Sequence, residues 1–235
     1  MPDRKFAHPR LAAVYDTFDS DRGDLQAYED ITAELGAHHI LDYGCGTGCL
    51  AVRLAATSHR VTGYDPATAS LDVARAKTDT VTWVGDLDGL SGFDLVTMTG
   101  NVAQVFLTDT DWNTTLQTIF GLLRPGGHLV FETRRPEYRV WDEWAHRRSE
   151  TRDVPGIGEV RHDFQLTDVR LPYVSFRDTY TFADGDVLTS DSTLRFRDRH
   201  ELDAGLTAAG FRITDVRQAP DRPAMQRVFL CEKPS

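Results

Sequence analysis

A short run with three alternating glycines, ILDYGCGTGCLAVRLA from Ile40, constrains the fold more than any other part of the sequence. The apolar residues before the glycines predict a strand, and those after them predict a helix. Glycine permits a tight turn between the two and lets a ligand approach the backbone without interference from a Cβ atom. Because the helix begins with unpaired N–H groups and a positive dipole end, the turn is expected to bind a small ligand.

The spacing of the glycines separates two kinds of ligand. Dinucleotide-binding turns follow G-x-G-x-x-G and place a pyrophosphate at the helix N-terminus. Here the third glycine, Gly48, comes one position early, and Cys49 stands where that pattern needs glycine or alanine. The carboxylate of Asp42, two residues before Gly44, would repel a pyrophosphate but would suit the ammonium group of a methionine-like ligand.

In the order Asp42, Gly44, Gly46 and Gly48, the run resembles the first motif, [D/E]-x-G-x-G-x-G, of the class I S-adenosylmethionine-dependent methyltransferases. The resemblance implies that S-adenosylmethionine is the cofactor and S-adenosylhomocysteine its product. It also places the intervening residues in the cofactor-binding turn; these are Cys45, of which only the backbone needs to matter, and Thr47.

Further motifs follow in the family's order and spacing. Asp65, before Pro66, ends a predicted second strand about 20 residues after the turn, where an acid can bind both ribose hydroxyls. That position is shared by other nucleotide-binding folds. The resemblance gives Asp86 a hydrogen bond from the adenine amino group. It extends the cofactor site to six more residues and ends in a helix-turn-strand segment at residues 122–133; the six are Pro66, Gly85, Leu87, Thr99, Gly100 and Asn101.

Composition indicates a single globular α/β domain of 235 residues with 40% hydrophobic residues. The net charge of −10 and the scarcity of lysine argue against a nucleic-acid substrate. No stretch is apolar enough for a membrane span and no signal-peptide core is visible, so a cytoplasmic location is expected. The three cysteines, Cys45, Cys49 and Cys231, form no disulfide framework and no metal-ligand spacing.

The order of elements predicts the architecture. Strands and helices alternate from residue 40 to 133, which indicates a mostly parallel sheet covered by helices on both faces. The family resemblance makes this a Rossmann-like three-layer sandwich with seven strands. From Val160, three extended stretches, with a hairpin turn at Asp184-Gly185, indicate an antiparallel insertion before a last helix that begins after Asp198. We expect one domain with an N-terminal helical segment (1–36), a cofactor-binding core (37–133), an inserted lid and cap (134–197) and the end of the core (198–235).

Two parts of the chain are expected to face the substrates. In the N-terminal segment, Tyr15 matches a tyrosine that closes over the methionine end of the cofactor in related enzymes, although packing in an amphipathic helix explains it nearly as well. Arginines interleaved with Trp141 and Trp144 in residues 134–152 indicate a lid that touches substrate, or else a solvated helix.

Methyl transfer from a sulfonium needs mainly a positioned and desolvated nucleophile, so it asks little of side chains. Asn101, after the fourth strand, is the best-placed residue to orient an amine or hydroxyl acceptor. Glu132 is a candidate base or amine anchor, and Arg134 a candidate partner for an acidic substrate. Both are equally explained as structural ion-pair partners. The residues after Asn101 depart from the Asn-Pro-Pro-Tyr signature of nucleic-acid and glutamine N-methyltransferases, which argues against those substrates.

We therefore predict a methyltransferase that acts on a nitrogen or oxygen of a small molecule. Two alternatives stay open at this point. One is a non-catalytic protein that binds S-adenosylmethionine or S-adenosylhomocysteine, and the other is an NAD(P)-dependent oxidoreductase. The sequence does not identify the acceptor or the oligomeric state.

Overall fold

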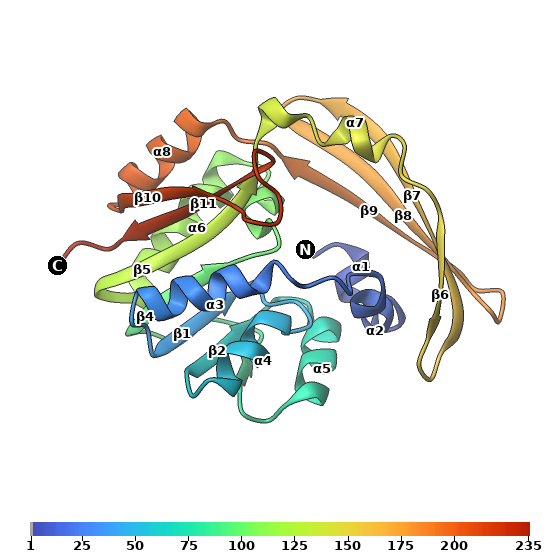
Figure 1. The fold of residues 1–235 in the computed structure, drawn as a ribbon, viewed down its shortest axis with the longest axis horizontal. Coiled ribbons are helices and arrows are strands. Elements are labelled where there is room, and N and C mark those ends of the chain that lie inside the picture. Colours follow the sequence, from blue (N-terminus) through green and yellow to red (C-terminus); the bar gives the residue numbers. More distant parts are fainter. Residues whose placement is uncertain (1) are drawn as a thin grey trace.

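The computed structural model describes residues 2–235 and contains two sheets, which Figure 1 shows at opposite sides of the molecule. The larger sheet has seven strands in the order β10-β11-β5-β4-β1-β2-β3. All neighbouring strands are parallel except β11, which is antiparallel to β5 and to β10. The predicted fold class is confirmed. The strands are β1 (His39–Tyr43), β2 (Arg60–Tyr64), β3 (Thr82–Val84), β4 (Phe93–Met98), β5 (Leu123–Arg134), β10 (Arg212–Gln218) and β11 (Gln226–Glu232).

Helices cover both faces of this sheet because its central strands carry buried apolar residues on both faces. Consecutive residues point to opposite faces, so Ile40 of β1 packs into one core and Leu41 into the other. The first core is completed by α3 (Leu25–Glu34) and α4 (Cys49–Ala56). The second is completed by α6 (Asp109–Leu122) and α8 (Arg199–Ala208), and α5 (Thr68–Lys77) joins β2 to β3.

Two helix starts show how local sequence sets the boundaries. The helix expected after Asp198 is α8, and it begins with a capping box: the Asp198 side chain accepts from the Glu201 N–H, and the Glu201 side chain accepts from the Asp198 N–H. Helix α6 begins at Asp109, two residues before Asp111, where the Thr110-Asp111 pair would have suggested a start. Its N-cap is Thr108, whose hydroxyl accepts from the Asp111 N–H at 3.0 Å.

The second sheet, here called the cap, is antiparallel and has four strands in the order β6-β7-β8-β9. Every second residue of β8 is buried, which is the pattern of a sheet with one covered face. The sequence indicated three extended stretches, but the first of them contains a turn at Leu171-Pro172, and β6 lies in the segment expected to be a lid or helix. The strands are β6 (Glu150–Val154), β7 (Gly158–Arg170), β8 (Tyr173–Phe182) and β9 (Val187–Arg195).

An N-terminal arm of two helices, α1 (Arg4–Ala7) and α2 (Pro9–Phe18), lies between the core and the cap (Figure 1). Towards the cap, the Lys5 ammonium pairs with Asp178 of β8 at 3.3 Å, and Leu11 and Val14 pack on cap residues. Towards the core, the Ser70 hydroxyl of α5 donates to the Phe6 carbonyl at 3.0 Å. The remaining helical pieces are η1 (Val102–Val105), η2 (Pro136–Tyr138) and α7 (Trp141–Trp144). In residues 2–235, no helix is both long and apolar enough to cross a membrane.

Candidate active site

The three glycines of the turn after β1 have three different surroundings. All have positive φ, which favours glycine. A Cβ atom on Gly44 would lie 2.8 Å from the Val102 side chain, and one on Gly48 would lie 2.3 Å from the Trp83 ring. A Cβ atom on Gly46 would meet nothing within 4 Å in the described chain. Gly44 and Gly48 therefore allow packing inside the protein, and Gly46 alone faces open space, where a ligand can approach.

Two carboxylates flank this turn in different environments. Asp65, at the end of β2, accepts hydrogen bonds from the Gly46 N–H at 2.9 Å and the Ala67 N–H at 2.8 Å. It thereby ties the turn to the start of α5. Asp42 lies beneath the turn, 2% exposed, and accepts from the Thr97 hydroxyl at 3.0 Å. Burial raises the pKa of Asp42 to about 6, despite that hydrogen bond.

The N-terminal arm is attached to the same turn. The Thr47 hydroxyl donates to the Asp16 carboxylate, which also pairs with the Lys77 ammonium. The Lys77 ammonium donates in turn to the Thr47 carbonyl at 2.7 Å. These bonds place Tyr15, the neighbour of Asp16, beside the turn, and burial raises the pKa of its hydroxyl, which stays protonated. Tyr15 also contacts the Phe6 ring and lines the cavity described below.

The other residues predicted to bind the cofactor lie along the same edge of the sheet. The Asp86 side chain is exposed after β3 and accepts from the Asp88 N–H at 3.1 Å, while Leu87 packs on the core. Gly85 and Pro66 are exposed at the ends of their strands. Cys45 is half-buried below the turn, and burial raises the pKa of its thiol, so this thiol stays protonated.

This arrangement fits an adenosyl ligand. The open face of Gly46, the Asp65 carboxylate and the exposed Asp86 follow three successive parallel strands, β1, β2 and β3, at their carboxyl ends. An open α/β sheet binds its ligands at that edge. The same edge continues past the carboxyl ends of β4 and β5, and that part of it is left for the other substrate.

Beyond β4, Asn101 adopts a left-handed backbone conformation with φ 62° and is 3% exposed. Its backbone N–H and its side-chain amide both donate to Glu132 Oε1, at 3.2 and 3.3 Å. The Tyr28 hydroxyl donates to Glu132 Oε2 at 2.5 Å, and the Gln226 amide, oriented to satisfy its neighbours, donates there at 2.7 Å. Glu132 is thus enclosed by donors and fixes Asn101, whose Oδ1 has no hydrogen-bond partner among residues 2–235.

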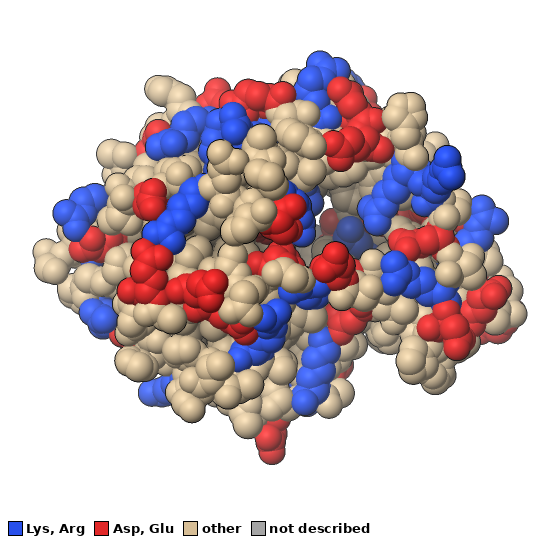
Figure 2. Space-filling view, in the orientation of Figure 1, with Lys and Arg blue, Asp and Glu red and all other residues tan. Residues whose placement is uncertain are grey.

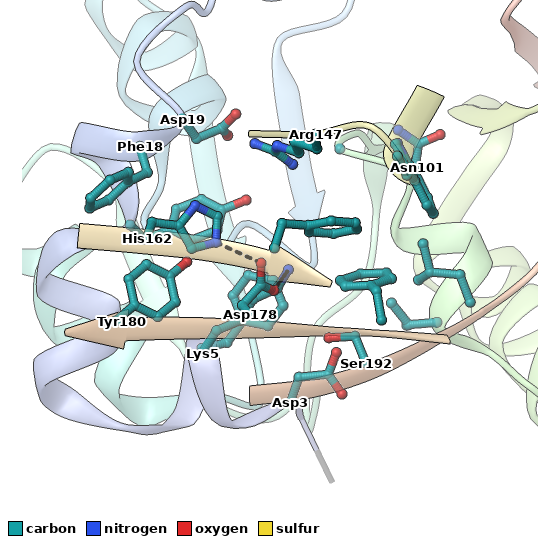
Figure 3. Close-up of a pocket in the computed structure, with 18 of the residues that line it drawn as sticks. Asp3, Lys5, Phe18, Asp19, Asn101, Arg147, His162, Asp178, Tyr180 and Ser192 are labelled. Atoms are coloured by element: carbon teal, nitrogen blue, oxygen red, sulfur yellow. Dashed lines mark hydrogen bonds and ion pairs between the residues drawn. The ribbon is translucent and has the colours of Figure 1, made fainter. Parts of the chain in front are cut away.

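A cavity of about 230 Å³ separates this edge from the cap, and Figure 2 shows the hollow between the two parts of the molecule. Figure 3 shows its lining, to which the core, the arm and the cap all contribute. Aromatic rings form much of the wall, and charged groups are interspersed. The core provides Gly100, Asn101, Val105 and Arg134; the arm provides Asp3, Lys5, Phe6, Tyr15, Phe18 and Asp19; the rest are Trp144, Arg147, His162, Phe164, Phe176, Asp178, Tyr180, Ser192 and Leu194.

The cap contributes polar residues that the sequence alone did not single out as a group. His162 Nε2 lies 2.8 Å from Asp178 Oδ1, and its ring stacks on Tyr180 with centroids 4.6 Å apart. Ser192, 4% exposed, has a hydroxyl without a hydrogen-bond partner in the described chain. Strand alternation is the signal that could have found them, because these positions share the apolar face of β7, β8 and β9.

The lid residues also separate into two roles. Trp144 lines the cavity, whereas Trp141 is 3% exposed and packs edge-on against Phe196 inside the cap. The lid segment thus has one tryptophan available to a ligand and one that serves the packing of the cap.

Comparison with known proteins agrees with this geometry. Residues 40–127 match the model of a methyltransferase domain. A protein of Geobacillus sp. (strain WCH70) that is assigned as a methyltransferase is 29% identical over 216 residues, covering 84% of this chain and 85% of its own. The fold is that of the class I S-adenosylmethionine-dependent methyltransferases, and the cofactor of that fold is S-adenosylmethionine. These matches favour a methyltransferase over the oxidoreductase alternative.

Several solved structures share this fold over most of the chain. A sugar N-methyltransferase from Streptoalloteichus sp. superposes with a TM-score of 0.78 at 19% identity, covering 94% of this chain and 93% of its own. An S-adenosylmethionine-dependent methyltransferase from Clostridium acetobutylicum gives 0.75 at 16% identity, with 96% and 98% covered. An amino pentose methyltransferase from Micromonospora echinaspora, solved with S-adenosylmethionine, gives 0.71 at 23% identity, with 94% and 96% covered. The fold, cap included, is thus shared with these solved methyltransferases.

Proposed function

We propose that this protein transfers a methyl group to a nitrogen of a small polar molecule bound in the cavity between core and cap. The observation that carries this proposal is the Oδ1 atom of Asn101, which is buried at the cavity wall after β4 and has no hydrogen-bond partner within residues 2–235. A buried hydrogen-bond acceptor without a partner is energetically unfavourable. A ligand N–H or O–H is therefore expected to donate a hydrogen bond to this oxygen. A primary amine can donate one N–H there and keep its lone pair free for attack.

The chain's own residues have positioning roles in this reaction. When bound, S-adenosylmethionine supplies an activated sulfonium methyl group, which needs no further activation by the protein. Asp65 and the open face of Gly46 would hold its adenosyl part, and Asp42 the methionine end. Glu132 holds the Asn101 amide in one orientation through the two bonds to Oε1. The cap and arm line the cavity with aromatic rings and would reduce the contact of a bound acceptor with water, which favours an in-line attack.

Two solved relatives in the comparison support nitrogen over oxygen, because their names specify a sugar N-methyltransferase and an amino pentose methyltransferase. A hydroxyl acceptor could donate to Asn101 in the same way. Nitrogen is also the less demanding acceptor, since a neutral amine attacks without first losing a proton.

The test uses methyl-labelled S-adenosylmethionine and matched acceptor pairs, each an amino sugar and the corresponding hydroxyl sugar. Label in the amines supports the proposal, and label only in the hydroxyl compounds would assign an oxygen acceptor instead. Binding of S-adenosylhomocysteine without label in either class would contradict the proposal. An Asn101→Gly variant, which keeps the left-handed backbone, should lower kcat while leaving S-adenosylhomocysteine affinity unchanged.

A further inference from the structure

Arg134, at the end of β5, is a cavity residue whose positive charge is not neutralised by the chain. Its Nη1 atom donates to the neutral side chain of Gln104 at 3.0 Å, and it forms no ion pair in the structure described for residues 2–235. The nearest carboxylate along the strand, Glu132, is occupied by Tyr28 and Asn101. Burial lowers the pKa of Arg134 to about 10, so the nearby carboxylate does not offset the loss of solvent.

A second guanidinium lies near the first on an aromatic platform. The Arg134 guanidinium carbon is 5.3 Å from the Trp144 ring centre, and that of Arg147 is 5.2 Å from the Phe164 ring centre. The two rings contact each other edge-to-face with centroids 6.0 Å apart. Arg147 reaches Glu150 only at 4.0 Å and its side chain is 46% exposed, so it stands at the mouth of the cavity.

The acidic residues of the cavity wall do not neutralise these arginines. Asp178 is bound by Lys5 and His162, and Asp19 pairs with Arg22 at 3.2 Å. Asp3, on the arm, forms no ion pair within the part of the chain described, which suits an acceptor that carries an amine as well. Among the cationic side chains of the cavity wall in residues 2–235, the guanidinium groups of Arg134 and Arg147 are therefore the ones without a close carboxylate.

We propose that the acceptor carries an anionic group, a carboxylate or a phosphate, and that Arg134 and Arg147 bind it against Trp144 and Phe164. This inference rests on the proposed function, because it assigns the cavity to the acceptor. A guanidinium presents paired N–H donors that match the two oxygens of either anion. Stacking on aromatic rings fixes the plane of the guanidinium, and the buried charge of Arg134 is then compensated only when the acceptor is bound.

The experiment titrates inorganic phosphate and, separately, acetate into the protein and its S-adenosylhomocysteine complex, at constant ionic strength set with chloride. Tryptophan fluorescence reports binding because Trp144 lies under the Arg134 guanidinium; a Trp144→Phe variant should lose the signal. Saturable binding of at least one anion is expected, and the anion that binds more tightly identifies the group that the acceptor carries. Arg134→Gln should weaken it by about tenfold or more, the range of a lost charged hydrogen bond.

Arg177→Gln is the matched control. It removes the same charge from the outer face of β8, where Arg177 pairs with Asp191 at 2.7 Å, and should leave anion binding unchanged. Equal anion binding in Arg134→Gln and the wild type, or no saturable response to either anion in the wild type, would overturn the inference. Calorimetry with S-adenosylhomocysteine on the same samples separates this outcome from a failure of the proposed function. Loss of that binding in the wild type would instead contradict the methyltransferase site.

Discussion

Glu132 Oε1 accepts hydrogen bonds from both the backbone N–H and the side-chain amide of Asn101. One carboxylate oxygen therefore sets the backbone conformation and the side-chain orientation of the residue that faces the acceptor. The remaining Oε2 is occupied by Tyr28, which comes from helix α3 on the core. This makes Glu132 a positioning residue for Asn101, and it does not line the cavity as a base would.

Replacing Glu132 with Gln should lower both stability and turnover. The amide presents N–H donors to Tyr28 or Asn101, which are themselves donors, so one buried bond is lost. We expect a decrease in the free energy of unfolding of about 1–3 kcal/mol. Urea unfolding measures it, and kcat should fall while S-adenosylhomocysteine affinity is retained. A variant with normal kcat would contradict the positioning role.

Alanine substitutions at two glycines of the turn should act on different properties: one mainly on cofactor binding, the other mainly on the stability of the fold. Gly46→Ala adds a Cβ atom in open space, so it should reduce stability only by the roughly 1–2 kcal/mol of a left-handed alanine but impair cofactor binding strongly. Gly48→Ala drives a Cβ atom to 2.3 Å from Trp83 and should destabilise the fold more than Gly46→Ala does. Unfolding curves and calorimetry with S-adenosylhomocysteine distinguish the two. Equal destabilisation by both substitutions would show that Trp83 gives way.

Asp65→Ala should weaken S-adenosylmethionine binding by about 1.5–3 kcal/mol, the contribution of a charged hydrogen-bonding group. The same substitution should also lower the stability of the fold, because the Gly46 and Ala67 N–H groups lose their hydrogen-bond acceptor. Asp65→Asn offers a matched comparison, because its oxygen keeps one of these bonds while the charge is removed. An unchanged dissociation constant in both variants would contradict the role of Asp65 in binding ribose.

Stability should depend on pH through Asp42. Because its pKa is raised from 3.8 to about 6, the folded state binds the proton more tightly than the unfolded chain. The resulting stabilisation is present below about pH 4 and is lost as the pH rises through 6, amounting to about 3 kcal/mol. Asp42→Asn should therefore exceed the wild type in stability at pH 8 and match it near pH 4. A difference that does not change with pH would contradict this assignment.

Two serines on β9 provide a matched pair for the cavity. Ser192→Ala removes a buried hydroxyl without a partner, so it should leave stability unchanged and raise the acceptor's KM. Ser190→Ala removes the acceptor of the Lys5 N–H, at 2.9 Å, and should loosen the arm, lowering stability by about 1 kcal/mol. Steady-state kinetics and urea unfolding check both. Reversed effects would place Ser192 in the packing of the cap and not in the site.

The core could be predicted from the sequence because local signals there agree with the fold. Asp42, the glycines and Asp65 are set by a strand, a turn and a second strand that lie close in sequence. The strands of the cap were predicted less accurately. The turn at Leu171-Pro172, which separates β7 from β8, lies inside a run of strand-forming residues and does not interrupt its hydrophobic pattern. The cavity could not be predicted at all. His162 and Asp178 meet through the pairing of β7 with β8, and Lys5, which is distant in the sequence, reaches Asp178 only because the arm packs on the cap.

The attachment of the arm to both the cofactor turn and the cap has a consequence for how the two substrates bind. Asp16 binds the cofactor turn through Thr47, and eleven residues earlier Lys5 binds the cap through Asp178. A rearrangement of the turn would therefore be transmitted along α1 and α2 to the roof over the acceptor. Each substrate should then change the affinity for the other by the same factor, as thermodynamic linkage requires. The methyl donor and the acceptor would thus affect each other's binding although they contact different parts of the protein.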